Sequence, residues 1–255
     1  MTMRRVVRNA PVRSVGEFID RATAVADRWC EEQHFAPWFR GQPRASDELL
    51  PSIYRNKNRN LNELDCRFDF RLRAYPFLEG VAREPQSEWE WYFLMQHHGL
   101  PTRLLDWSES ALVALYFAVI DIRFKSNPVV WMLDPWAINE RIARLGARIF
   151  GAEDRELQQY LPADDAGAIP LEPISLQAPY ASRCIAAQKG CFTLHGSARK
   201  PLDAYAQLSH FLHRIPFSRR HQPQMLAQLA VAGVTKTAVF PDLSNLASEL
   251  LEYWR

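Results

Sequence analysis

The stretch QHHGLPTRLLDWSESALVALYFAV, residues 96–119, decides the fold because it joins a strand pattern to a helix pattern. PTRLLDW (101–107) is a short apolar run typical of a strand, and ALVALYFAV (111–119) predicts a buried helix. Ser108 stands where a serine side chain can cap the first turn of that helix. The stretch therefore predicts a domain that mixes α and β structure.

The residues before this stretch predict mostly helices around one strand. Ser14 with Glu17, and Ser87 with Glu90, have the spacing of a capping box and begin two of the helices. The expected elements are a helix from Ser14, a strand in APWFRGQ (36–42) that begins after Pro37, a helix near 60–75 and a helix over 87–99.

The residues after the stretch continue the alternation. Residues 147–179 are polar and rich in proline, so we expect an irregular excursion there. The expected elements are strands over 128–134, 211–217 and 236–242, a short strand marked by Gly190 and Phe192, and helices over 135–146, 222–233 and 246–254. We therefore expect one α+β unit with a polar cleft, divided into an N-terminal helical segment (1–34) and a main domain (35–255).

Composition limits the classes of function. The chain has 255 residues, 47% of them hydrophobic, which is enough for a large core. Its net charge of +2 is too small to attract nucleic acid or an anionic membrane to the molecule as a whole. The longest apolar run is far shorter than the ~20 residues that span a bilayer, so we expect no membrane association. The four cysteines show no ligand spacing, which favours a cytoplasmic protein without a structural metal.

Arg40 is the first candidate for a binding residue. It lies in an aromatic strand and precedes Gly41, whose missing side chain would let a ligand approach the backbone. Such an arginine suits bidentate recognition of a phosphate. The alternative is an arginine at a strand edge that pairs with a carboxylate.

The densest group of polar side chains is Gln96, His97, His98, Arg103 and Asp106, between two apolar segments. Burying such groups is costly unless they face one another or a ligand. The adjacent histidines diverge in direction and cannot easily share a metal ion. We therefore expect a binding or catalytic cluster and no metal site.

Two later segments add candidates. In RCIAAQKGCFTLHG (183–196), Gln188 precedes a short strand, although an ordinary hairpin explains the pattern equally well. HFLHRIPFSRRHQ (210–222) places three arginines beside aromatic residues, which indicates either an RNA-binding patch or a solvated basic face.

The chain resembles the FRG domain family, which is named for an aromatic-Arg-Gly motif and is found in bacteria and their mobile elements. The resemblance rests on FRGQ (39–42), LLPSIYR (49–55), QHHGLPTRLLDWSESALVALYFA (96–118), RCIAAQKGCFTLHG (183–196) and VFPDLSNLASEL (239–250).

The order of these motifs is also distantly similar to that of arginine-type ADP-ribosyltransferases. That resemblance implies an ADP-ribosyltransferase-like fold and NAD as substrate. It implies that Arg40 holds the phosphate, that Ser108 or Ser110 lies at the strand-to-helix junction, and that Asp106 or Glu109 supplies charge beside Gln188. The remaining candidates come from the motifs themselves: Gly41, Gln42 and Arg103 for nucleotide binding, and His98 for catalysis. Gln188 stands near the place of the transferases' catalytic glutamate, and a glutamine cannot stabilise a cationic transition state equally well.

The leading hypothesis is a cytoplasmic, nucleotide-directed enzyme that uses NAD as an ADP-ribosyltransferase-like toxin or phage-defence effector, with RNA or protein as acceptor. The alternative is a module that binds nucleotide or RNA without catalysis. A third hypothesis is a metal-dependent nuclease built on His98 and Asp106. The sequence leaves the oligomeric state open.

Overall fold

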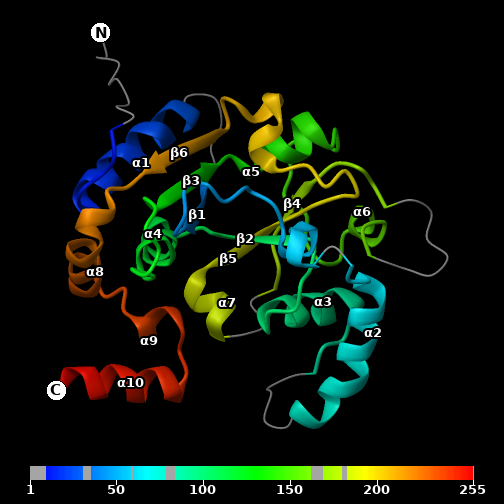
Figure 1. Cartoon of the computed structure of the whole chain (residues 1–255). Helices are drawn as coiled ribbons and strands as arrows, with labels where there is room; N and C mark the ends of the chain where they lie inside the picture. The colour runs from blue at the N-terminus through cyan, green and yellow to red at the C-terminus, as the bar shows by residue number, and fades with distance from the viewer. Residues whose placement is uncertain are drawn as a thin grey trace.

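A six-stranded antiparallel sheet runs through the centre of the molecule (Figure 1). The computed structural model describes residues 10–30, 36–58, 60–78, 84–161, 169–179 and 183–254. The strand order is β4-β5-β2-β1-β3-β6. The strands are β1 (Trp38–Gln42), β2 (Leu104–Ser108), β3 (Val129–Leu133), β4 (Ile174–Leu176), β5 (Gly190–Leu194) and β6 (Leu212–Pro216).

The sheet is weakly joined between β1 and β2. Five residues of β1 lie opposite five residues of β3, and five residues of β2 lie opposite five residues of β5. The register between β1 and β2 consists of Phe39 opposite Ser108. The two halves of the sheet therefore meet at one point and separate beyond it, which creates room for a pocket.

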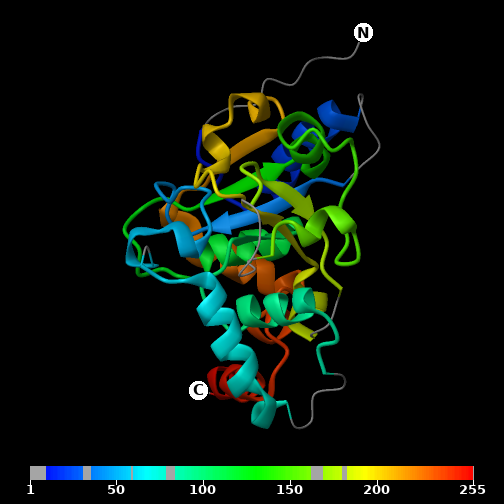
Figure 2. The same cartoon turned by 90° about the vertical axis from the view of Figure 1, so that its right-hand side faces the viewer.

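Helices cover both faces of the sheet (Figures 1 and 2). Residues of α1, α4 and α8 form one buried cluster with β1, β3 and β6, and α3 contributes to a second cluster with β4 and β5. The helices are α1 (Val15–Cys30), α2 (Glu63–Ala74), α3 (Glu88–His97), α4 (Ala111–Val119), α5 (Pro135–Ala137), α6 (Arg155–Gln158), α7 (Arg183–Gln188), α8 (Gln222–Val231), α9 (Lys236–Val239) and α10 (Leu243–Tyr253).

Gly41 sets how closely α4 approaches β1. A Cβ atom added at Gly41 would collide with the carbonyl oxygen of Ala114 and would lie 2.6 Å from the amide nitrogen of Ala118. Because both are backbone atoms, no side chain can move to make room. Glycine at this position is thus required by the packing of the helix on the strand.

A buried ion pair fixes α2 to the start of β2. The Nε of Arg103 donates to Glu63 at 2.6 Å, and the backbone amide of Arg103 donates to the same carboxylate at 3.1 Å. The guanidinium also donates to the carbonyl oxygens of Tyr160 and His195. These bonds satisfy a charge that would otherwise be costly to bury.

The predicted α+β fold is confirmed, and most expected elements are present. Ser14 and Ser87 accept the expected bonds at the starts of α1 and α3, and the strands in 36–42, 101–107 and 128–134 are formed. The N-cap of α4 is Ser110, because β2 continues through Ser108.

Three expectations about elements were wrong. Residues 236–242 were expected to be a strand, but Thr235 caps the short helix α9 there. Residues 147–179 were expected to be irregular, but they contain α6 and the edge strand β4. Residues 162–168 of this stretch lie outside the described part. The helix expected over 135–146 is a turn of α-helix followed by a π-helix over Ile138–Ile142.

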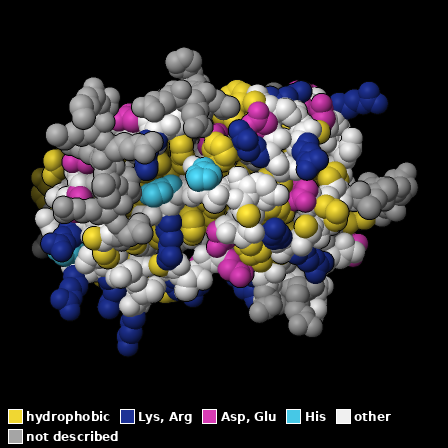
Figure 3. Space-filling view, turned by 90° about the horizontal axis from the view of Figure 1, so that it is seen from above, with side chains coloured by type: hydrophobic (Ala, Val, Ile, Leu, Met, Phe, Trp, Pro, Cys, Tyr) yellow, Lys and Arg dark blue, Asp and Glu magenta, His cyan; other side chains and the backbone are white. Residues whose placement is uncertain are grey.

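On the face shown in Figure 3, acidic and basic side chains are interspersed, so neither sign of charge dominates it. Within the described ranges, no helix combines the length and the apolar character that crossing a membrane requires. The expected boundary between residues 34 and 35 lies outside the described residues.

Candidate functional site

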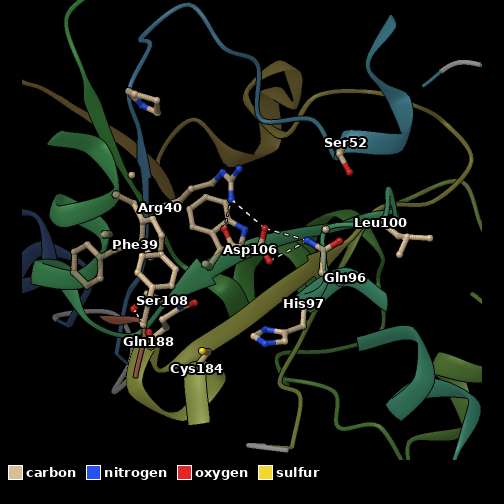
Figure 4. Close-up of a pocket in the computed structure, with 17 residues that line it drawn as sticks. Phe39, Arg40, Ser52, Gln96, His97, Leu100, Asp106, Ser108, Cys184 and Gln188 are labelled. Atoms are coloured by element: carbon tan, nitrogen blue, oxygen red, sulfur yellow. Dashed lines mark hydrogen bonds and ion pairs between the residues drawn. The ribbon is translucent and has the colours of Figure 1, made fainter. Parts of the chain in front are cut away.

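A pocket of about 670 Å³ opens where β1 and β2 separate. Pockets of this size are typical of small-molecule sites. Its wall comes from β1, β2, α3, α4, α7 and the segment after α9 (Figure 4). The described lining residues are Phe39, Arg40, Gly41, Pro43, Ser52, Gln96, His97, Gly99, Leu100, Asp106, Trp107, Ser108, Ala114, Phe117, Cys184, Gln188 and Phe240.

Arg40 crosses the gap between the two strands. Its guanidinium donates to the carbonyl oxygen of Asp106, and its Nη1 lies 3.8 Å from Oδ2 of the same residue. The side chain is only 17% exposed, and its buried Nε has no hydrogen-bond partner among the described residues. Burial lowers the pKa of Arg40, whereas Asp106 raises it. Arg40 is thus a largely buried cation with donor capacity left over.

The Asp106 carboxylate is held in the pocket by an amide. The Nε2 of Gln96 donates to both carboxylate oxygens, at 3.0 and 3.1 Å. The hydroxyl of Thr102 donates to the Oε1 of Gln96, which fixes the amide with its NH₂ group toward Asp106. Figure 4 shows Arg40 and Gln96 reaching the carboxylate from opposite sides. Because the Asp106 side chain is 58% exposed, its carboxylate remains accessible to a ligand.

His97 rather than His98 lines the pocket. His98 follows the last turn of α3, and its ring lies against His97 and Phe70, with ring centroids 5.1 and 6.4 Å away. Partial burial lowers the pKa of His97, and His98 lowers it further, while Asp106 raises it. A lowered pKa favours the neutral ring at neutral pH, so His97 can accept or donate a hydrogen bond.

Ser108 and Gln188 meet at the far end of the pocket (Figure 4). The hydroxyl of Ser108 donates to the carbonyl oxygen of Gln188 at 2.6 Å and accepts from the amide of Ser110. The Nε2 of Gln188 donates to the carbonyl oxygen of Val239 at 3.2 Å. The Gln188 amide is therefore tied to the C-terminal segment, whose Phe240 also lines the pocket.

Two other expected binding residues lie away from this pocket. Gln42 is buried between Trp131, whose indole donates to Oε1, and the carbonyl of Glu48, which accepts from Nε2. Arg103 is enclosed by its bonds to Glu63 and to backbone carbonyls. Both polar side chains are satisfied by the protein, so they have little capacity left for a ligand.

The described residues bear on the metal alternative and on one arginine of the basic segment 210–222. The described residues contain no group of three or more His, Cys, Asp or Glu side chains that could hold a metal ion. In the proposed RNA patch, Arg214 donates to the carbonyl of Ala45 and lies over the ring of Trp131. The pocket thiol, Cys184, has its pKa raised by burial, which disfavours the thiolate.

The sequence indicated one part of the wall and gave no signal for another. The polar cluster at 96–106 signals Gln96 and His97, but the choice between adjacent histidines depends on where α3 ends. Phe240 carries no local signal of function, because only tertiary packing brings α9 against α7.

The fold and the pocket define an α+β domain with a cation and a carboxylate at the junction of two half-sheets. Residues 36–126, the segment that includes β1, β2 and α4, match the family model of the FRG domain. Comparisons with curated proteins and with solved structures found no match to the chain.

Proposed function

We propose that the pocket binds NAD and that the protein cleaves the bond between nicotinamide and ribose, as an ADP-ribosyltransferase-like enzyme. The observation that carries the proposal is the pair of Arg40 and Asp106 at the junction of β1 and β2. A guanidinium suits a diphosphate, and a nearby carboxylate suits a sugar that becomes cationic.

Arg40 supports the binding step. Its Nε is buried and unpartnered among the described residues, and burial strengthens the attraction between a guanidinium and an anion. A phosphate oxygen in the pocket would accept a hydrogen bond from the exposed part of the guanidinium of Arg40, whose side chain is 17% exposed. The pocket volume of about 670 Å³ is in the range that encloses a ligand of this class.

Asp106 supports the chemical step. It is the one carboxylate among the described residues that line the pocket. In the reaction the bond from ribose C1′ to the nicotinamide nitrogen breaks, and the electron pair leaves with nicotinamide. The carboxylate stabilises the positive charge that develops on the ribose, and water or an acceptor nucleophile forms the new bond to C1′.

Binding without catalysis is the second candidate function. Gln188, near the place expected for a catalytic glutamate, is neutral and donates its amide to Val239. Both oxygens of Asp106 also accept hydrogen bonds from the Gln96 amide. These bonds partly offset the negative charge that would stabilise a cationic sugar. A pocket of this kind can hold a nucleotide while providing little stabilisation for a cationic sugar.

We further propose that the protein works in the bacterial cytoplasm as a toxin or phage-defence effector, with RNA or protein as the acceptor. This context rests on the FRG domain at residues 36–126. The distinguishing experiment measures NAD binding by calorimetry and nicotinamide release by chromatography on the same preparation. Binding with release supports the enzyme, binding without release supports the second candidate, and absence of both refutes the proposal.

A further inference from the structure

Helix α10 exposes its apolar side chains and turns polar side chains toward the protein, the reverse of an ordinary surface helix. Its inward side is polar: Asn245 donates to the carbonyl of Phe240, and Glu249 accepts from the amide of Thr237. Its apolar side chains face outward, and none of its residues is buried. The exposed apolar residues are Leu243, Leu246, Leu250, Leu251, Tyr253 and the adjacent Trp254. Surface helices normally bury their apolar face, so α10 has the arrangement of an interface helix.

The outward residues have the spacing of a helix-packing seam. Leu243, Leu246, Leu250 and Tyr253 are separated by three, four and three residues, which is the a and d pattern of a heptad. This spacing places all four side chains in one row that can pack into a second helix at a small crossing angle. The row contains no charged residue.

We propose that α10 docks on α10 of a second copy of this chain, in the antiparallel direction around a two-fold axis. The row is self-complementary in this direction. Leu246 of one copy then faces Leu250 of the other, and Leu243 faces Tyr253, each contact occurring twice. Closed two-fold pairs of this kind are the commonest form of oligomer.

The exposed area of α10 fits such an interface. Tyr253 and Trp254 are each 80% exposed. Aromatic side chains bury about 150–250 Å² each, so these two supply roughly a third to a half of the ~800 Å² that each partner buries in a standard interface. The four exposed leucines add to this area. A second copy therefore covers the apolar face without requiring another surface.

The interface is connected to the pocket wall through the hydrogen bonds between α10 and α9. Asn245 bonds to Phe240, which lines the pocket, and Glu249 bonds to Thr237 in α9. Self-association thus holds in place the segment whose Val239 carbonyl oxygen accepts a hydrogen bond from the Gln188 amide. The proposal itself does not depend on which ligand the pocket binds.

Sedimentation velocity over a wide concentration range tests the dimer. The wild-type chain is expected to show a reversible dimer, and Leu246→Asp with Leu250→Asp is expected to raise the dissociation constant by at least roughly thirtyfold. Leu171→Asp, at an exposed leucine far from α10 in sequence, is the matched control and leaves the dimer intact. Circular dichroism and thermal unfolding confirm that all variants fold, since the substituted side chains are exposed.

Cysteine cross-linking tests the direction. A mixture of Leu246→Cys and Leu250→Cys chains is expected to form disulfide-linked dimers faster than either chain alone, relative to the wild-type background from its own cysteines. A monomer at every concentration, a dimer that survives both aspartates, equal weakening by Leu171→Asp, or cross-linking only between identical variants would each overturn the proposal.

Discussion

Arg40 of β1 donates to the main-chain carbonyl oxygen of Asp106 in β2, and its guanidinium also lies 3.8 Å from the Asp106 carboxylate. The two strands share one register pair, at Phe39 and Ser108. They separate from there toward Arg40 and Asp106. The arginine therefore bridges a gap in the sheet and remains available to an anion in the pocket. This relationship explains why a strand contains a cation among aromatic residues.

Gly41→Ala is expected to destabilise the protein by at least about 3 kcal/mol, the upper end of overpacking effects. The added Cβ meets the backbone of Ala114 and Ala118 in α4, and backbone cannot repack locally. Urea unfolding measures the loss. Gly16→Ala is the control, because nothing lies within 4 Å of its added Cβ and it lies in a helix. An equal effect of the two substitutions would contradict the packing role of Gly41.

Asp106→Asn is expected to lower nicotinamide release by about 10²- to 10³-fold, the effect of removing one group that stabilises a transition-state charge. NAD binding should not weaken, because Arg40 keeps its charge. The unfolding midpoint should fall only slightly, because one of two hydrogen bonds from Gln96 to an exposed side chain is lost. Rapid-quench kinetics and calorimetry measure the two steps separately. Unchanged release in the variant would remove Asp106 from the chemistry.

Gln188→Glu is expected to lower stability by about 1–3 kcal/mol, because an oxygen replaces the donor that faces the Val239 carbonyl. The displaced carboxylate is expected to turn into the pocket and raise nicotinamide release. Gln207→Glu, at an exposed position, controls for the added charge. If stability falls while release stays constant, position 188 lies too far from the ribose to act on it.

His195 makes the free energy of unfolding depend on pH in the acid range. Burial, together with the charges of Arg40 and Arg103 and against a backbone hydrogen bond with Lys200 that raises it, lowers the pKa of His195 to about 3. Between about pH 3 and 6.5 the unfolded chain binds the extra proton, so stability falls as pH decreases, by about 1.4 kcal/mol per pH unit.

His195→Gln should remove this dependence. Burial raises the pKa of Asp134 to about 6, which has the opposite sign, so the two groups partly offset each other in the wild type. The comparison is therefore the difference between wild type and variant in denaturant unfolding from pH 6.5 to 4.5. A constant difference over that range would show that His195 binds its proton equally in the folded and unfolded chain.

The sequence predicted the elements whose signals are local. The strand with Arg40 and the helix 111–119 follow from hydrophobic pattern, and the capping serines 14 and 87 were located correctly. Strand β4 was missed because three residues in a polar, proline-rich stretch carry little pattern and depend on pairing with β5. The helix α9 was missed because its threonine and valine, and the phenylalanine that follows it, are also typical of strands.

The candidate site was predicted only in part. Arg40, Asp106, Ser108 and Gln188 do lie around one pocket, as the motifs indicated. The environment of Arg103 could not be predicted, because Glu63 is 40 residues away in the chain. The role of Gly41 was also hidden: a glycine that allows a helix to approach looks the same in sequence as one that allows a ligand to approach.

The central claim is that Arg40 holds an anionic nucleotide, and calorimetry of NAD binding tests it most directly. Arg40→Ala is expected to weaken binding by roughly tenfold to more than a hundredfold, the loss of a charge-assisted contact worth about 1.5–3 kcal/mol. Arg123→Ala is the control, since Arg123 is exposed and pairs with Asp121 on the surface. Unchanged NAD affinity in Arg40→Ala, with a large loss of unfolding free energy, would show instead that Arg40 serves only to join β1 to β2.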